Sequence, residues 1–244
     1  MKLIRISCLL LALPLVFLAS CKKDGSAPVV EADGSNYFPV QRGHFVEYHV
    51  DSTYWDDFLQ LETVHTMDLR HTVTDTFTDN VGRQSYTVTV SRRKDSSELW
   101  RPESVFTVTK TTNQVEWLQD NLRFVKMVFP VENGREWNGN EFVSTFNQDY
   151  QFYRDWKYTY ANVNQAYNNG YENFDKTVTV NQIDDSLNNP EQTPSAYATR
   201  TYSMEKYGLN VGLIERRFTR WIYDPGVRAA RKGNAVSMRA FNHN

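Results

Sequence analysis

The stretch VEWLQDNLRFVKMVF, residues 115–129, carries two runs of branched and aromatic residues separated by Gln119, Asp120 and Asn121. Val, Phe and Trp fit the pleated, half-buried surface of a strand. Asp and Asn tolerate the left-handed backbone of a tight turn. The stretch therefore predicts a β-hairpin.

The same signals recur on both sides of this hairpin. Residues 85–90 alternate apolar and hydroxyl side chains, which predicts an antiparallel strand with one buried face. Residues 213–223 predict another strand, which Asp224, Pro225 and Gly226 end, and residues 188–195 predict a loop. A 3.6-residue apolar period is not sustained, so little helix is expected.

These patterns predict an all-β fold for residues 37–244, a mostly antiparallel sheet that is barrel-like or sandwich-like. The length suits one large β domain or two small ones. The pattern leaves open one closed barrel or two packed half-domains.

Three short matches at nearly one offset predict an internal duplication, with halves at 38–128 and 129–221. Strands of similar composition look alike by chance, which is the alternative explanation. The paired segments are 38–40 with 129–131, 52–58 with 144–150, and 87–90 with 177–180.

The N-terminus has the three-part plan of a secretory signal, with Lys2 and Arg5 ahead of an apolar run at residues 9–18. That run is too short to span a bilayer. The segment 18–21, Leu-Ala-Ser-Cys, resembles the lipobox that the lipoprotein signal peptidase cleaves. The alternative is a soluble secreted protein with a chance cysteine there.

We therefore expect residues 1–20 to be removed, Cys21 to carry the lipid, and residues 21–36 to form a flexible tether. The protein would sit on a membrane through this lipid without crossing it. Cys8 would leave with the signal, so no disulfide is expected. Loss of Lys2 and Arg5 takes the formal net charge from −2 to −4, which argues against a nucleic-acid partner.

Four segments of the chain resemble the uncharacterised envelope lipoproteins of Bacteroidota. They are the aromatic-Pro turn, Gly and aromatic strand of 37–48, the FP-x-x-x-G to W-x-G segment of 129–139, the Tyr-Gly to Leu-Ile strand of 207–214, and the closing strand of 235–244. The resemblance implies an envelope location and a β fold and supplies no reaction. With the lipid on Cys21, we expect the protein to be anchored to the outer membrane. Residues 22–24 only partly resemble a surface-export signal, so the periplasmic or surface face stays open.

No catalytic pattern emerges from the sequence. His44 and His49 are five residues apart and would point to opposite faces of a strand, so no metal site is expected. The chain has no G-x-S-x-G elbow and no Gly-rich phosphate loop. Adjacent carboxylates such as Asp184 and Asp185 are typical of solvated turns. We expect neither enzyme activity nor a cofactor.

Aromatic residues are numerous, with six Trp, fourteen Tyr and fourteen Phe. Most are expected to fill a β core. Trp55, Trp137 and Trp156 are candidate ligand-binding residues, because polar residues surround them. A further candidate is a cationic, aromatic patch for an acidic ligand, formed by Arg216, Arg217, Arg220 and Trp221. The alternative for that run is the solvent face of an edge strand.

The sequence thus predicts a membrane-anchored envelope protein that binds a glycan or a partner protein without catalysis. The alternative hypothesis is a periplasmic carrier of lipid or lipoprotein. A carrier requires a large hollow lined by Val, Leu and Phe and empty of polar groups.

Overall fold

The hairpin predicted from residues 115–129 is confirmed. Strands β5 (Gln114–Gln119) and β6 (Leu122–Val128) pair antiparallel, with Gln119 opposite Leu122. Asp120 and Asn121 form the two-residue turn at φ 51° and 62°. Two consecutive left-handed residues are what a type I′ turn requires, and its twist matches that of the strands.

The computed structural model describes residues 33–244. The predicted signal peptide, Cys21 and the tether up to residue 32 lie outside the described residues. Residues 33–36, which the sequence placed in the tether, contact the β domain: the Val131 amide donates to the Asp33 carbonyl and the Asn210 amide to the Asn36 carbonyl. Within residues 33–244, no helix combines the length and the apolar character needed to cross a membrane.

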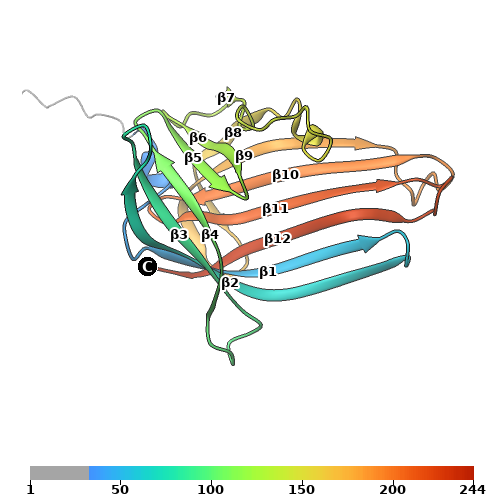
Figure 1. The fold of residues 1–244 in the computed structure, drawn as a ribbon, viewed down its shortest axis with the longest axis horizontal. Coiled ribbons are helices and arrows are strands. Elements are labelled where there is room, and N and C mark those ends of the chain that lie inside the picture. The colour runs from blue at the N-terminus through green and yellow to red at the C-terminus, as the bar shows by residue number, and fades with distance from the viewer. Residues whose placement is uncertain (1–32) are drawn as a thin grey trace, which may run out of the picture. The chain divides into compact units, whose positions relative to one another are not determined.

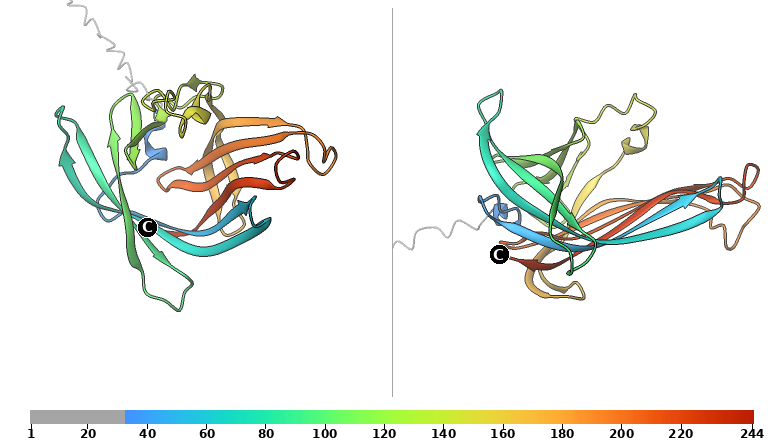
Figure 2. Two further views of the ribbon diagram at one scale, coloured as in Figure 1. Left: turned by 45° about the vertical axis from the view of Figure 1, so that its right-hand side comes forward. Right: turned by 60° about the horizontal axis from the view of Figure 1, so that its bottom comes forward.

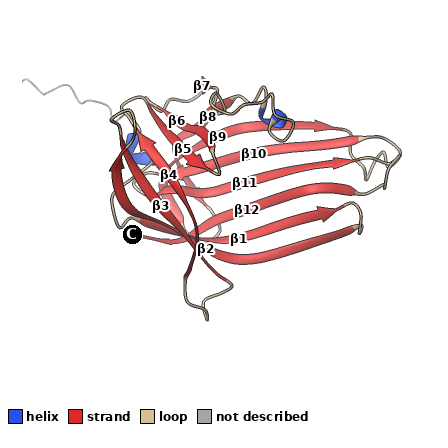
Figure 3. Ribbon diagram, viewed as in Figure 1, coloured by secondary structure: helices blue, strands red, loops and turns tan. Residues whose placement is uncertain are grey.

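Nearly all regular structure is antiparallel strand, which confirms the predicted fold class (Figures 1 and 3). The first half contains β1 (Phe45–Asp56), β2 (Leu61–Thr78), β3 (Gln84–Arg93) and β4 (Arg101–Lys110), then β5 and β6. The second half contains β7 (Glu136–Trp137), β8 (Tyr158–Asn168), β9 (Asn173–Leu187), β10 (Ala198–Gly208), β11 (Gly212–Tyr223) and β12 (Arg231–His243). Two 3₁₀ turns, η1 (Ser35–Tyr37) and η2 (Gln151–Tyr153), complete the described elements.

Each half is a meander, and the two join where β1 pairs with β12. The sheet order is β6-β5-β4-β3-β2-β1-β12-β11-β10-β9-β8-β7. The sheet curls until its two ends nearly meet: the Val125 amide of β6 donates to the Gly139 carbonyl at 2.8 Å, just after β7. The Tyr160 hydroxyl on β8 bridges both backbone groups of Val128 at 2.9 Å. The result is a nearly closed barrel.

Beyond the barrel, β9, β10, β11, β12, β1 and β2 run on as a sheet, which we call the blade (Figures 1 and 2). β3 pairs with β2 only as far as Asp68, and β8 pairs with β9 only as far as Asn181. Past these points the blade consists of residues 51–56, 61–67, 183–187, 198–202, 219–223 and 231–235.

The core lies inside the barrel. Phe106 of β4 stacks on Trp117 of β5 with ring centroids 3.6 Å apart. Large side chains from the opposite walls are almost fully buried, among them Tyr48, Tyr158 and Tyr207. Most of their hydroxyls are hydrogen-bonded, as a buried tyrosine requires: Tyr48, for example, donates to the Leu213 carbonyl at 2.9 Å.

Candidate functional site

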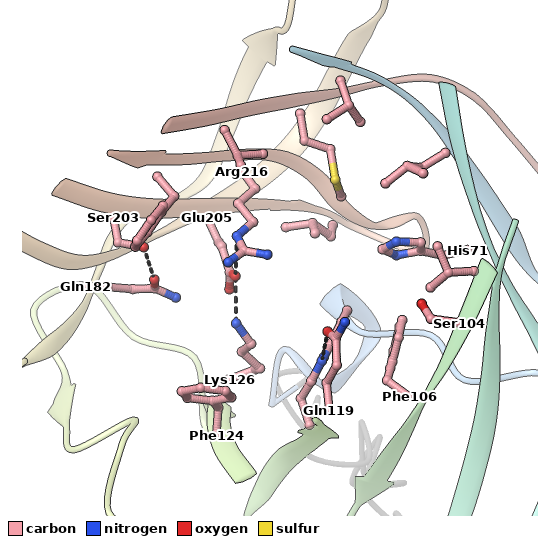
Figure 4. Close-up of a pocket in the computed structure, with 18 of the residues that line it drawn as sticks. His71, Ser104, Phe106, Gln119, Phe124, Lys126, Gln182, Ser203, Glu205 and Arg216 are labelled. Atoms are coloured by element: carbon pink, nitrogen blue, oxygen red, sulfur yellow. Dashed lines mark hydrogen bonds and ion pairs between the residues drawn. The ribbon is translucent and has the colours of Figure 1, made fainter. Parts of the chain in front are cut away.

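A cavity of about 260 Å³ opens inside the barrel, between β9–β12 on one side and β4–β6 with the segment around η2 on the other (Figure 4). Its walls combine aromatic rings with charged and amide groups. The residues that carry the argument below are His71, Trp117, Phe124, Lys126, Tyr153, Trp156, Gln182, Ser203, Glu205 and Arg216.

An ion cluster lies in this cavity. Glu205 of β10 accepts from Lys126 Nζ of β6 at 2.7 Å, and Arg216 Nε of β11 lies 3.8 Å from the same carboxylate oxygen. The Tyr207 hydroxyl donates to the other oxygen at 2.7 Å. Glu205 is 2% exposed, so β6 and the β10–β11 hairpin, which are far apart in sequence, combine to hold one buried carboxylate.

The charges of the cluster support one another. Burial opposes ionisation of Glu205, but Lys126 and Arg216 outweigh it and lower the pKa of the carboxyl below its ordinary value. Burial lowers the pKa of Lys126, which Glu205 partly offsets. Burial also raises the pKa of the Tyr207 hydroxyl, which keeps it a donor. Glu205 therefore stays an ionised acceptor whose partners are supplied by the protein.

Two buried donor atoms in the same cavity make no hydrogen bond within residues 33–244. One is Arg216 Nε, and the other is the amide nitrogen of Gln182 on β9. The Ser203 hydroxyl donates to the Gln182 amide oxygen, which leaves the amide nitrogen free (Figure 4). Buried polar groups are nearly always hydrogen-bonded, by protein, water or ligand. The two unpaired donors thus suit an acceptor-rich ligand.

Aromatic rings form much of the remaining wall. Lys126 Nζ lies 5.5 Å from the ring centroids of both Trp117 and Phe124, within cation–π range. Phe124 packs edge-on against Tyr153, with centroids 5.4 Å apart. Flat apolar faces therefore lie next to the donors, as in sites that hold a ring with polar substituents.

His71 lines the cavity on the β2 side, edge-on to Phe106 and Trp117 at centroid distances of 5.3 and 6.1 Å. Burial, assisted by the positive charge of Arg216, lowers the pKa of His71 to about 3. The imidazole is therefore neutral at physiological pH. Among residues 33–244, no group of three or more His, Cys, Asp or Glu side chains is arranged to hold a metal ion.

The three tryptophans predicted as ligand contacts do not come together. Trp156 lines the cavity, is 5% exposed, and donates its indole N–H to the Phe152 carbonyl. Trp137 packs on Tyr160 and donates to the Val125 carbonyl, at the seam of the barrel. Trp55 lies in the blade and donates to the Glu62 carboxylate. Of the three, the cavity walls contain Trp156.

The arginine run of β11 is split between two faces. Arg216 enters the cavity, and its neighbour Arg217 pairs instead with Glu215, as the alternation of a strand dictates. Arg220 packs over the Phe152 ring at 4.4 Å. The edge-strand explanation of this run is wrong, because β11 pairs with β10 on one side and β12 on the other.

Sequence reasoning missed Lys126, Gln182 and Glu205, which carry most of the site's polarity. A signal existed for Lys126, a charge between the apolar residues Val125 and Met127 of a predicted strand. The condition set for a lipid carrier is not met by this cavity, because charged and amide groups share its lining with the apolar residues.

Comparisons with known proteins do not assign this chain to a family. No protein-family model matches the sequence, and no curated protein matches it. A solved structure with some likeness is that of a Bacteroides fragilis protein inferred to be exported and described as having a YmcC-like fold. It is 9% identical, with 85% of this chain and 98% of that chain covered, at a TM-score of 0.39. The functional assignment therefore depends on the cavity itself.

Proposed function

We propose that this chain is a non-catalytic, lipid-anchored binding protein of the cell envelope whose barrel cavity holds an acidic sugar unit of a glycan. The observation that carries the proposal is that two buried donor atoms in one aromatic-walled cavity, Arg216 Nε and the Gln182 amide nitrogen, make no hydrogen bond.

The chemistry of the walls favours this ligand class. A carboxylate is the natural partner of a guanidinium, since the charge-assisted hydrogen bonds between them are short and directional. The C–H faces of a sugar ring are apolar and can lie against rings such as Phe124 and Tyr153. A site of about 260 Å³ is slightly below the range of roughly 300–1,000 Å³ typical of drug-sized ligands, so one sugar unit is the appropriate size.

The interior charges support binding rather than proton transfer. Glu205 is ionised and already receives hydrogen bonds from Lys126 and Tyr207, so its role is to hold those groups in place. The predicted lipid on Cys21 would keep such a receptor at the outer membrane.

The test is a titration of the full chain in detergent with D-glucuronate, followed by tryptophan fluorescence, since Trp117 and Trp156 line the cavity. We expect a saturable change with glucuronate and at least tenfold weaker binding by Arg216→Gln. The matched control is Arg228→Gln at the far end of the blade, which should bind as the parent does. An equal response to D-glucose, or unchanged affinity in Arg216→Gln, would contradict the proposal.

A further inference from the structure

One stretch of the blade has an open side. Residues 61–67 of β2 pair with β1, but β2 meets β3 only from Asp68 onward. Within residues 33–244 nothing pairs with the outer side of this stretch, and six of its seven residues are exposed. Alternate backbone N–H and C=O groups of an edge strand point outward and can accept another strand.

This edge lacks the usual protection. Natural edge strands carry charges, proline or bulges that prevent further pairing. The stretch LETVHTM at 61–67 has one charged residue, Glu62, and no proline, and the bulge of β2 lies beyond it at residues 73–75. The opposite edge of the blade, at the end of β9, carries Asp184 and Asp185 side by side. The β9 edge of the blade therefore carries two adjacent charges that oppose further strand pairing, whereas the β2 edge carries one.

A groove of about 930 Å³ runs beside the open edge. Its lining includes Val64 to Met67 of β2 and residues of the β3–β4 hairpin. The course of this hairpin past β2 can be followed in Figures 1 and 2. Its charged lining residues are Arg92, Arg93, Lys94, Arg101, Glu98 and Glu103. Four cations against two carboxylates leave the groove positive.

Two of these cations are available to a ligand. Arg92 is paired with Glu103, and Arg93 with Asp68. Lys94 and Arg101 make no ion pair with any residue between 33 and 244 that the structure records. They lie at the two ends of the hairpin loop that faces the open edge.

From these features we infer that β2 takes up an extended acidic segment of a partner protein, which adds to the sheet as a strand along residues 61–67. Main-chain hydrogen bonds to the open edge provide the affinity, and the hairpin cations select acidic side chains on the added strand. Seven residues span about 23 Å of strand, enough for a short specific segment. This surface is separate from the barrel cavity.

The experiment uses the full chain and a fluorescein-labelled heptapeptide in which glutamate alternates with valine. The control peptide alternates lysine with valine. We expect saturable anisotropy with the glutamate peptide only. The double variant Lys94→Glu/Arg101→Glu should bind it at least tenfold more weakly, whereas Arg228→Glu/Lys232→Glu, with the same charge change elsewhere on the blade, should bind within twofold of the parent.

Hydrogen exchange separates strand addition from simple charge attraction. With the glutamate peptide bound, amides of residues 61–67 should become protected while those of residues 183–187 stay unchanged. Peptide binding without protection of residues 61–67 would overturn the inference, as would equal binding of the lysine peptide. Protection that appears without peptide and rises with protein concentration would also overturn it, because the occupant would then be a second copy of this chain.

Discussion

Several strands run through both the barrel and the blade, but the burial of their side chains differs between the two regions. On β2, His71 lies in the barrel between aromatic rings, while residues 61–66 in the blade are all exposed. Strand propensity does not change along β2. The burial changes because β3 and β8 turn away from the sheet, which removes both a lateral neighbour and the opposite wall.

The two regions therefore depend on different forces. In the barrel, apolar burial contributes most of the stability, and the buried ion pairs keep the interior charges from being left without a partner. In the blade, the strand ladder and cross-strand pairs such as Trp55 with Glu62 contribute more, since residues 61–66 are all exposed. The two proposed binding sites divide in the same way, with a cavity in the barrel and an open strand edge in the blade.

The largest change in the unfolding free energy is expected when one carboxylate is removed from each region, Glu205 from the barrel and Glu62 from the blade. Glu205→Ala leaves Lys126 buried without its partner, and breaking a buried pair in this way costs about 3–5 kcal/mol of the unfolding free energy. Glu62→Ala removes an exposed acceptor of Trp55 and should cost less than about 1 kcal/mol. Urea unfolding of the full chain measures both.

The double variant Lys126→Met/Glu205→Leu provides the control for this pair. It removes both charges and retains most of the side-chain volume, so it should recover much of the stability lost in Glu205→Ala. A double variant no more stable than Glu205→Ala would show that packing, and not the unpaired lysine, causes the loss.

A second comparison makes one substitution in both regions. Val108→Ala on β4 empties a site that is 0% exposed and should cost about 2 kcal/mol. Val64→Ala on β2 acts on a side chain that is 55% exposed and should stay within about 0.5 kcal/mol. Similar losses in the two variants would mean that the blade has a packed partner in solution.

Local strand signals in the sequence were sufficient for the fold class. The alternation at residues 85–90 places Val88 and Val90 in the core, and the predicted strand at 213–223 corresponds to β11. The blade could not be predicted in this way. Its strands carry the same Thr, Val and Tyr as the barrel, and where β3 and β8 leave the sheet depends on long-range pairing.

Sequence reasoning predicted only some of the residues that line the cavity. The idea of a cationic, aromatic site for an acidic ligand included Arg216, but Lys126, Gln182 and Glu205 come from strands that only the closed sheet brings together. The internal duplication stays a prediction. Its segments 87–90 and 177–180 lie on β3 and β9, each the third strand of its half, while 52–58 starts in β1 and 144–150 lies in a loop.

The third prediction concerns pH, and it again contrasts two positions on β2. Burial keeps His71 neutral down to a pKa of about 3, whereas in the unfolded chain its pKa is near 6.5. Below pH 6.5 the unfolded state therefore binds a proton that the folded state does not. The unfolding free energy should fall by up to about 1.4 kcal/mol for each pH unit between these values.

Removing the imidazole should flatten this dependence. Between pH 6 and 4, His71→Phe should lose less stability per pH unit than the parent, while His65→Phe, at an exposed position on the same strand, should follow the parent profile. Urea unfolding at several pH values gives the slopes. Equal slopes for the parent and His71→Phe would mean that water reaches the cavity and that His71 is protonated in the folded barrel, which would also weaken the case for a cavity that holds its ligand by unpaired buried donors.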